Sequence, residues 1–392
     1  MRRPTLKKKR LEIPPLLAFH TCSTLNRLII ATAMASRFSP PATPLLVGER
    51  HLPDDVLQRV LVGLPLEVHR AAASVCKSFR RVIAGPRFLA ERRRYGFAER
   101  GVVTVCNGSV GDDVLQIKMA HKSDVMATIP VDRLSYYSTT TDGGARLFVC
   151  TRGVGSDLRP PAAGEGGIPG QVLALDPSSR RWRRFATLPQ VRDLHCLEWH
   201  NGLLYVAGGI SSSTGIPINS FNVFSEATGL WEELPAMPHA CVWAASGVIG
   251  NELFIASGMS GSESNTLQIY DTAARTWRLG APIPVVHTLG SGSGARKPKG
   301  VVVDGKLFLF SSRLQSPLVY EPQSNTWTEE AVPEIHGTSV LHACAHEGRV
   351  FAFRRDGTAY SRATDGSWSL CTRAVDRENP PSTCVSGSVL LG

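Results

Sequence analysis

One motif returns along the chain at a nearly constant interval. A short apolar run ends in Asp, Glu or Ser, and a Trp follows six or seven residues later. The runs are VLALD, FNVFS, LQIYD, PLVYE and TAYS, and their tryptophans are Trp182, Trp231, Trp277, Trp327 and Trp368. Successive tryptophans are 49, 46, 50 and 41 residues apart. A period in this range is typical of propeller blades or of helical arrays.

The segments between the tryptophans favour strands over helices. In the unit from Leu194 to Glu233, HCLEWH and LLYVAGG flank the turn dipeptide Asn201-Gly202, and NSFNVF and LWEELP follow. Short runs rich in β-branched and aromatic residues, broken by Gly, Asn and Pro, indicate strands joined by hairpins. Each unit therefore predicts a four-stranded blade. The interval before each Trp predicts a fixed tight turn between the third and fourth strands, and we expect the indoles to pack between blades as part of the core.

This pattern resembles the kelch repeat, in which an apolar strand ends in Gly-Gly, a Tyr-Asp pair follows, and a Trp comes next. Gly208-Gly209 is the one full double glycine, and Tyr270-Asp271 is the one complete Tyr-Asp pair. The spacing and the tryptophans carry the resemblance over about two-thirds of the chain. The resemblance implies a kelch-type β-propeller.

Counting strands predicts six blades. Upstream of the first complete unit, GVVTVC, VLQIKM and VMATIP supply three strands without a first one, and TCVSGSVLL near the C-terminus is a single orphan strand. The count closes if this last strand is the missing first strand of the blade near residues 102–130. Five blades with an irregular N-terminal strand pair is the competing arrangement. The expected fold is mainly β, with a six-bladed propeller over residues 98–392.

Charge and cysteine usage narrow the classes of function. Residues 1–50 carry nine Lys or Arg against two Glu, so seven of the ten net positive charges lie there. The folded remainder is nearly balanced, and it lacks the alternation of aromatic and basic residues typical of a single-strand nucleic-acid binder. No apolar run is long enough to span a bilayer. Nine cysteines without CxxC pairs favour reduced thiols over a disulfide framework.

Residues 1–50 are basic and broken by Pro and Ser, and we expect them to be disordered. Lys7 to Arg10 fits a nuclear import run or a solvated charge cluster. The acid-free stretch 16–38 also fits a transit peptide. A third reading places the true start at Met34. The location expected for the protein is the nucleus, the cytoplasm or both.

From residue 51 to residue 97 the apolar residues return at helical spacing. A Pro followed by two Asp favours a helix start, because the helix dipole stabilises acids there. Gly63 and Pro65 interrupt the first helix, and Gly85-Pro86 ends the third. Three short helices bury little apolar surface, so we expect the domain to use a partner. A helical cap on the propeller is the alternative.

This helical segment resembles the F-box. LPDDVLQRVLVGLPL and SVCKSFRRVI match that family, with Phe79 where the family most often has Trp. The resemblance implies binding to the Skp adaptor of a Skp–cullin–F-box ubiquitin ligase, and through it to cullin. An F-box followed by kelch repeats is an arrangement abundant in plants. Carried over residue by residue, the helical box and its adaptor face comprise Leu52, Pro53, Val56, Leu57, Val60, Leu61, Leu64, Pro65, Val75, Cys76, Phe79 and Ile83.

Three residues past the proline that ends a blade, the kelch adaptors typically place an Arg that lines the substrate face. The same count nominates Arg192, His287 and His336 here, while one unit has Cys241. An exposed Arg or His could pair with acidic or phosphorylated groups of a target. The alternative is that these side chains bond backbone carbonyls between blades. The long loops Gly153–Gly170 and Thr288–Lys299 fit either recognition or plain disorder.

No cofactor, metal or catalytic residue is expected. His342, Cys344 and His346 alternate along one strand, but no acidic fourth ligand is evident, so a strand lining the channel is the preferred interpretation over zinc. Hydrolase, phosphate-loop and dinucleotide motifs are absent from the sequence. The resemblance implies a non-catalytic adaptor that brings an unknown target protein to a ubiquitin ligase. A kelch scaffold without ubiquitin transfer is the alternative, and an enzyme with a copper or sugar site comes third.

Overall fold

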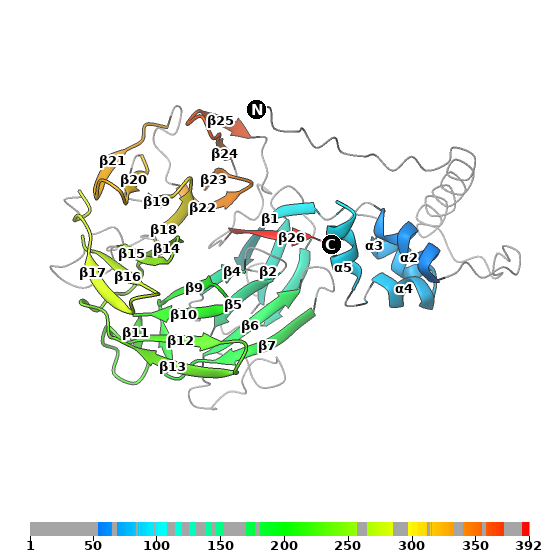
Figure 1. Cartoon of the computed structure of the whole chain (residues 1–392), viewed down its shortest axis with the longest axis horizontal. Coiled ribbons are helices and arrows are strands. Elements are labelled where there is room, and N and C mark those ends of the chain that lie inside the picture. Colours follow the sequence, from blue (N-terminus) through cyan, green and yellow to red (C-terminus); the bar gives the residue numbers. More distant parts are fainter. Residues whose placement is uncertain are drawn as a thin grey trace, which may run out of the picture. The chain divides into compact units, whose positions relative to one another are not determined.

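The computed structural model describes two compact units, which meet in the chain at Ala98 (Figure 1). One unit carries the helices α2 to α5, and the other extends from Glu99 to Leu391. The structure describes residues 54–64, 69–83, 85, 87–97, 99–107, 114–119, 125–130, 138–142, 146–151, 170–176, 181–256, 265–284, 297–311, 314, 316–332, 340–354, 358–371 and 386–391. The predicted disordered segment 1–50 lies outside these residues.

Four short helices make up the described part of the N-terminal unit, where the sequence predicted three. They are α2 (Asp54–Val62), α3 (His69–Val75), α4 (Lys77–Ile83) and α5 (Phe88–Arg94). The first three follow the predicted pattern, and Gly63 lies directly after α2 as expected. Helix α5 was not predicted, because its single buried aromatic, Phe88, gives no apolar stripe. Phe88 is 3% exposed and joins the core made by α2 and α3.

The C-terminal unit contains six antiparallel four-stranded sheets, which we number as blades in chain order. Blade 1 holds β26 (Ser386–Leu391), β1 (Glu99–Asn107), β2 (Val114–Met119) and β3 (Val125–Pro130). Blade 2 holds β4 (Ser138–Thr141), β5 (Leu147–Thr151), β6 (Gln171–Asp176) and β7 (Arg181–Thr187). Blade 3 holds β9 (Cys196–His200), β10 (Leu203–Ala207), β12 (Phe221–Ser225) and β13 (Leu230–Leu234).

The other three blades repeat this order. Blade 4 holds β14 (Ala245–Ile249), β15 (Glu252–Ala256), β16 (Leu267–Asp271) and β17 (Thr276–Leu279). Blade 5 holds β18 (Lys299–Val303), β19 (Lys306–Phe310), β20 (Leu318–Glu321) and β21 (Thr326–Glu329). Blade 6 holds β22 (Val340–His346), β23 (Arg349–Arg354), β24 (Ala359–Arg362) and β25 (Trp368–Cys371). A two-stranded ribbon of β8 (Arg192–Asp193) and β11 (Ile210–Ser211) accompanies blade 3.

The C-terminal strand closes the ring, as the strand count predicted. Strand β26 pairs antiparallel with β1 from Glu99↔Leu391 to Thr104↔Ser386, so it is the first strand of blade 1. The first strands also contact one another in a complete circle: β26, β4, β9, β14, β18, β22 and back to β26. Figure 1 shows the sheets following one another around this unit in chain order. The six-blade prediction is therefore confirmed, and the five-blade alternative is not.

The tight turn before the repeat Trp has the same backbone geometry in the four blades where the structure describes it. The residue two positions before the Trp has a positive φ in four blades: Gly229 (72°), Arg275 (59°), Asn325 (52°) and Gly366 (87°). This left-handed residue lets the chain reverse and start the fourth strand, which pairs with the third in every case. The predicted fixed turn between strands three and four is therefore confirmed in these blades.

The tryptophans lie at the boundaries between blades and are half-buried. Trp231, Trp277, Trp327 and Trp368 each pack against a core cluster whose residues come from their own blade and the one before. Three indole N–H groups donate to the chain leaving the preceding blade: Trp277 to Pro235 O (2.8 Å), Trp327 to Ala281 O (2.9 Å) and Trp368 to Glu330 Oε1 (2.7 Å). The indole thus fastens each blade to its predecessor as well as filling the space between them.

Gly208 and Gly209 show why one copy needs the full double glycine. Both have positive φ, 62° and 102°. A Cβ on Gly208 would lie 2.5 Å from Cys241 O, and a Cβ on Gly209 would lie 2.5 Å from Asp193 O. Gly209 N also donates to Cys241 O at 2.8 Å. Only glycine permits this close approach of the loop before blade 4 to the end of the second strand of blade 3.

We predict that Gly229→Ala lowers the free energy of unfolding by about 1 kcal/mol, because alanine must adopt a left-handed backbone there. A Cβ at this position would meet no atom within 4 Å, so steric overlap does not contribute. Gly229→Asn should cost less, since Asn tolerates this conformation. Urea unfolding of the two variants and the wild type measures the difference. Equal stability of the alanine variant and the wild type would contradict the account of the turn.

Candidate functional site

The helical unit separates the predicted adaptor-binding residues into an interior set and a surface set. Leu57, Leu61 and Leu64 are 5%, 0% and 8% exposed and form the core with Ala72 and Phe88. They hold the helices together and are the core members of the predicted set. The half-buried Phe79 and Ile83 pack against the same core.

The junction of α3 and α4 carries the exposed members of the predicted set. Val75 is 41% exposed, and Cys76 beside it is also exposed. Val60 on α2 is half-buried. Leu52, Pro53, Pro65 and the side chain of Val56 lie outside what the structure describes. An exposed apolar residue at a helix junction is suited to a protein contact, and this corner is the described part of a candidate interaction surface.

A buried arginine fixes the end of α2. Arg92, on α5, is 1% exposed, and its Nη1 donates to the carbonyl oxygens of Val62 and Leu64, both at 2.6 Å. Its Nη2 donates to Phe97 O. The last carbonyls of a helix have no partner within the helix, so a guanidinium placed there satisfies them and complements the helix dipole. This role could not be predicted from the sequence, because Arg92 is the first of three consecutive arginines and nothing distinguishes it from the other two.

Arg192 is buried, which corrects the prediction that it lines a substrate face. It is 2% exposed, and its Nη1 donates to Gly208 O (3.3 Å) and Ser220 O (3.1 Å). Its Nη2 donates to Asn222 Oδ1 at 2.9 Å. Burial lowers the pKa of Arg192 to about 10, so it remains protonated at neutral pH. The guanidinium holds the loop before blade 3 against that blade, mainly through backbone carbonyls.

His287 and His336 lie outside the described residues, so their role stays a prediction. Cys241, at the same count in its unit, is 4% exposed and packs between blades 3 and 4. In both described units, this position therefore faces the interior of the propeller.

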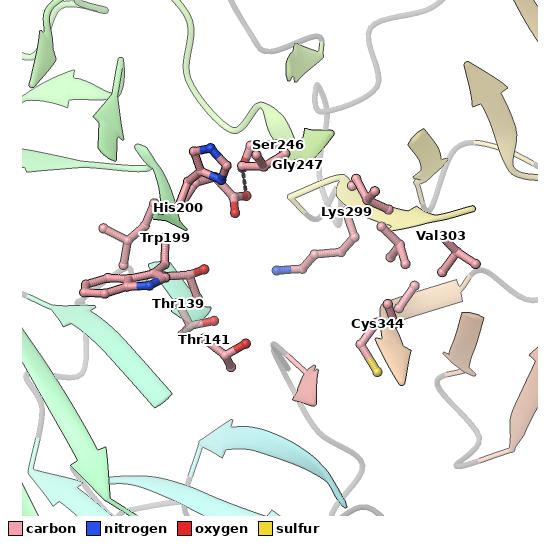
Figure 2. A pocket seen from close by; sticks show the side chains of 18 of the residues that line it. Thr139, Thr141, Trp199, His200, Ser246, Gly247, Lys299, Val303 and Cys344 are labelled. Carbon is pink, nitrogen blue, oxygen red and sulfur yellow. Dashed lines mark hydrogen bonds between the residues drawn. The ribbon is translucent and has the colours of Figure 1, made fainter. Parts of the chain in front are cut away.

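The central channel of the propeller is a cavity lined by polar and charged residues (Figure 2). Its volume is about 910 Å³, and its walls come from β4, β9, β14, β18 and β22 and from the turns that follow them. Figure 2 shows the side chain of Lys299 extending from β18 into the open space, with Thr139 and Thr141 of β4 on another side. Lys299 was predicted to lie at the end of a long basic loop, but it is the first residue of β18.

Two hydrogen bonds organise the polar groups of the channel. Ser246 Oγ donates to Glu198 Oε1 at 2.6 Å, joining β14 to β9. Burial raises the pKa of Glu198, while the bond from Ser246 and the charges of the channel lysines oppose that shift. Lys297 Nζ donates to His195 O at 2.8 Å, so it connects the chain entering blade 5 to the chain entering blade 3.

The ring of His195 does not act as a base in this arrangement. It is 3% exposed, and burial lowers its pKa to about 3, with the charges of Lys297 and Arg192 acting in the same direction. Neither ring nitrogen has a hydrogen-bond partner among the described residues. The neutral ring therefore fills space, and the main-chain carbonyl of the same residue makes the polar contacts, including one from Ser138 Oγ at 2.6 Å.

Nothing in the described residues groups three His, Cys, Asp or Glu side chains closely enough to hold a metal ion. Cys344 is 4% exposed and packs with Phe353 and Ala359. The side chain of His342 is not described. None of the described helices has the length and hydropathy of a membrane span.

Comparison with known families matches both units. The family model of the F-box domain matches residues 50–91, and that of the kelch motif matches residues 194–238. The F-box match is therefore followed by a propeller of which one blade matches the kelch motif. The F-box match contains α2, α3 and α4, and the kelch match runs through blade 3 with its double glycine and Trp231.

The similar proteins combine the same two modules. Two F-box/kelch-repeat proteins of Arabidopsis thaliana are each 23% identical to this chain, over 321 and 328 residues. The first alignment covers 80% of this chain and 87% of the relative, and the second covers 81% and 80%. A solved structure titled "Structure of YjhT" aligns at a TM-score of 0.49 with 13% identity, over 70% of this chain and 95% of its own. At this low identity and TM-score, the match adds no support to the strand pairing described above.

We predict that Arg92→Leu lowers the free energy of unfolding of the F-box by about 3 kcal/mol, because the carbonyls that Arg92 satisfies lose a charged donor. Arg92→Lys should lose less, since it keeps a charge but not the forked geometry. Arg94→Leu is the matched control, because 72% of the Arg94 side chain is exposed. Hydrogen exchange of α2 in the full-length variants reports the effect. Unchanged protection of α2 in Arg92→Leu would contradict the capping role.

Proposed function

We propose that this chain is the substrate-recognition subunit of a Skp–cullin–F-box ubiquitin ligase. The observation that carries the proposal is the presence of an F-box domain and a kelch propeller on one chain. F-box/kelch relatives that align over most of their length support the same arrangement. In this proposal the F-box docks on the Skp adaptor, and through it on cullin, while the propeller binds a target protein.

The proposed mechanism is proximity. A target held by the propeller meets the ligase-bound ubiquitin-conjugating enzyme at a high effective concentration, so the transfer of ubiquitin becomes close to an intramolecular reaction. The conjugating enzyme supplies the chemistry, and this chain supplies only the two binding surfaces. The protein is then a non-catalytic component of an enzyme complex, which acts in the nucleus, the cytoplasm or both.

The adaptor surface in this proposal is the exposed part of the predicted set. Val75 and Cys76 present it at the α3–α4 junction, and Leu52 and Pro53 are its predicted continuation. The buried leucines of α2 form the core of this unit. A charge at Leu57 would disrupt the core as well as any interface, so it cannot separate binding from folding.

For the target, the proposal is less specific. His287 and His336 remain predicted members of the substrate face, in loops that connect the fourth strand of one blade to the first strand of the next. A kelch scaffold that binds a partner without ubiquitin transfer is the second candidate. The kelch match by itself is consistent with that scaffold, whereas the F-box match favours the ligase subunit.

The test is binding of a purified Skp adaptor to the full chain by calorimetry. Val75→Asp should weaken binding at least about tenfold, because it places a charge in an apolar contact. Tyr95→Asp is the matched control, since Tyr95 is 45% exposed on the same unit and lies outside the proposed surface. Leu52→Ala/Pro53→Ala tests the predicted continuation of the surface.

Circular dichroism of each variant separates a lost surface from a lost fold. Binding by the wild type and Tyr95→Asp, together with loss in a folded Val75→Asp, supports the ligase role and this surface. Equal binding by Val75→Asp and the wild type would move the adaptor surface elsewhere. No binding by the folded wild type would overturn the ligase role and leave the scaffold.

A further inference from the structure

The helical unit is strongly basic, whereas the propeller is not. Residues 51–97 contain nine Lys or Arg against four Asp or Glu, and residues 98–392 contain 25 against 27. Two of the basic side chains of the helical unit have a partner inside it: Arg92 caps α2, and Arg94 pairs with Glu91 at 3.8 Å. The remaining excess of positive charge raises the question of what it binds.

Helix α4 concentrates three of these charges on one face. Lys77, Arg80 and Arg81 are all exposed, and residues three or four positions apart are neighbours on a helix surface. We call these three residues the basic face of α4. Among the residues that the structure describes, none of the three forms an ion pair with a carboxylate. Like charges at this spacing slightly destabilise a helix, so the row does not serve the stability of α4.

The helix dipole accounts for only part of the basic face. Arg80 and Arg81 lie in the last turn of α4, where a positive charge is favourable. Lys77 is the first residue of α4, where the dipole disfavours a cation, and the first turn contains no acidic residue to balance it. The charge of Lys77 is therefore a property of the surface and not a requirement of the helix.

The basic face adjoins the exposed apolar residues of the α3–α4 junction. Lys77 directly follows Val75 and Cys76 in the chain, and both of those are exposed. Arg80 Nε donates to Ala73 O at 3.3 Å, so its guanidinium is held beside the end of α3. A protein–protein interface typically combines an apolar centre with a charged rim. This combination fits a protein partner better than a phosphate backbone, which would leave Val75 without an apolar contact.

We propose that the basic face of α4 docks against an acidic surface of the Skp adaptor and steers the encounter between the two proteins. The inference rests on the proposed ligase role and adds the chemistry of the partner, which presents carboxylates beside the site that receives Val75. Charges at the rim of an interface change mainly the rate of association, because they attract the partner before contact. Salt screens this attraction, so the association rate falls as the ionic strength rises.

The test measures the association and dissociation rates of a purified Skp adaptor and the full chain by surface plasmon resonance, at low and at high salt. Lys77→Glu/Arg81→Glu should lower the association rate at low salt at least about tenfold and change the dissociation rate less. The neutral variant Lys77→Gln/Arg81→Gln should lie between this variant and the wild type. Arg80 stays unchanged, because its bond to Ala73 O also holds α3.

Arg87→Glu/Arg94→Glu is the matched control. It makes the same change of charge on the same unit at two exposed side chains, but Arg87 precedes α5 and Arg94 ends it. The control should keep most of the wild-type association rate and its dependence on salt. Circular dichroism checks that every variant is folded.

The outcomes separate this inference from the ligase role. A wild type that does not bind the adaptor overturns both. A wild type that binds, while folded Lys77→Glu/Arg81→Glu associates as fast as the control at low salt, overturns the basic face alone. A short DNA duplex and vesicles of phosphatidylserine are tested in parallel. Loss of their binding in Lys77→Glu/Arg81→Glu, with unchanged association of the adaptor, would assign the face to a polyanion and overturn the proposal.

Discussion

The pairing of β26 with β1 is the interaction on which the propeller depends. Each blade buries its two faces against its neighbours, so an open ring would expose the faces of its two end blades. Six residue pairs between the C-terminal strand and the strand that follows the F-box remove those open faces. Closing the ring therefore removes from water the apolar surface that an open arrangement would leave exposed at its two ends.

The seams between blades combine apolar packing with a small number of directed bonds. Trp277, Trp327 and Trp368 each donate to the chain leaving the preceding blade, so the repeat spacing seen in the sequence is a spacing of inter-blade fasteners. Elsewhere, Gln268 holds the main chain of His239 by two hydrogen bonds. These bonds fix the loops at one end of the blades, where the channel begins. A binding surface on such loops would be largely pre-formed, which reduces the entropy lost on association.

The sequence predicted features whose cause is local or periodic. The turn before the repeat Trp was predictable because the interval between the end of the third strand and the Trp is nearly constant. The ring closure was predictable because three strands near the N-terminus lacked a first strand and a single strand was left over at the C-terminus. Arg192 could not be assigned correctly in the same way. Its position after a proline fixes where it lies along the chain, but its burial depends on Gly208 and Asn222 of the same blade.

The same limit applies to Arg92 and Lys299. One caps a helix that precedes it by 30 residues, and the other enters a cavity made by five separate strands. Neither position is marked in the sequence by a repeat period or by a motif. The composition around Lys299 instead suggested a disordered loop, because KPK follows a segment rich in Gly and Ser. The positions of single polar side chains thus required the three-dimensional structure, whereas the architecture did not.

Hydrogen exchange of the C-terminal strand in the full-length protein tests the central claim most directly. If β26 closes the ring, the amides of residues 386–391 will be protected to the same order as those of β9 and β14, and they will exchange together with their partners on β1. Exchange of the 386–391 amides at the rate of an unfolded peptide, while the strands of blades 2 to 6 stay protected, would contradict the closed six-bladed propeller.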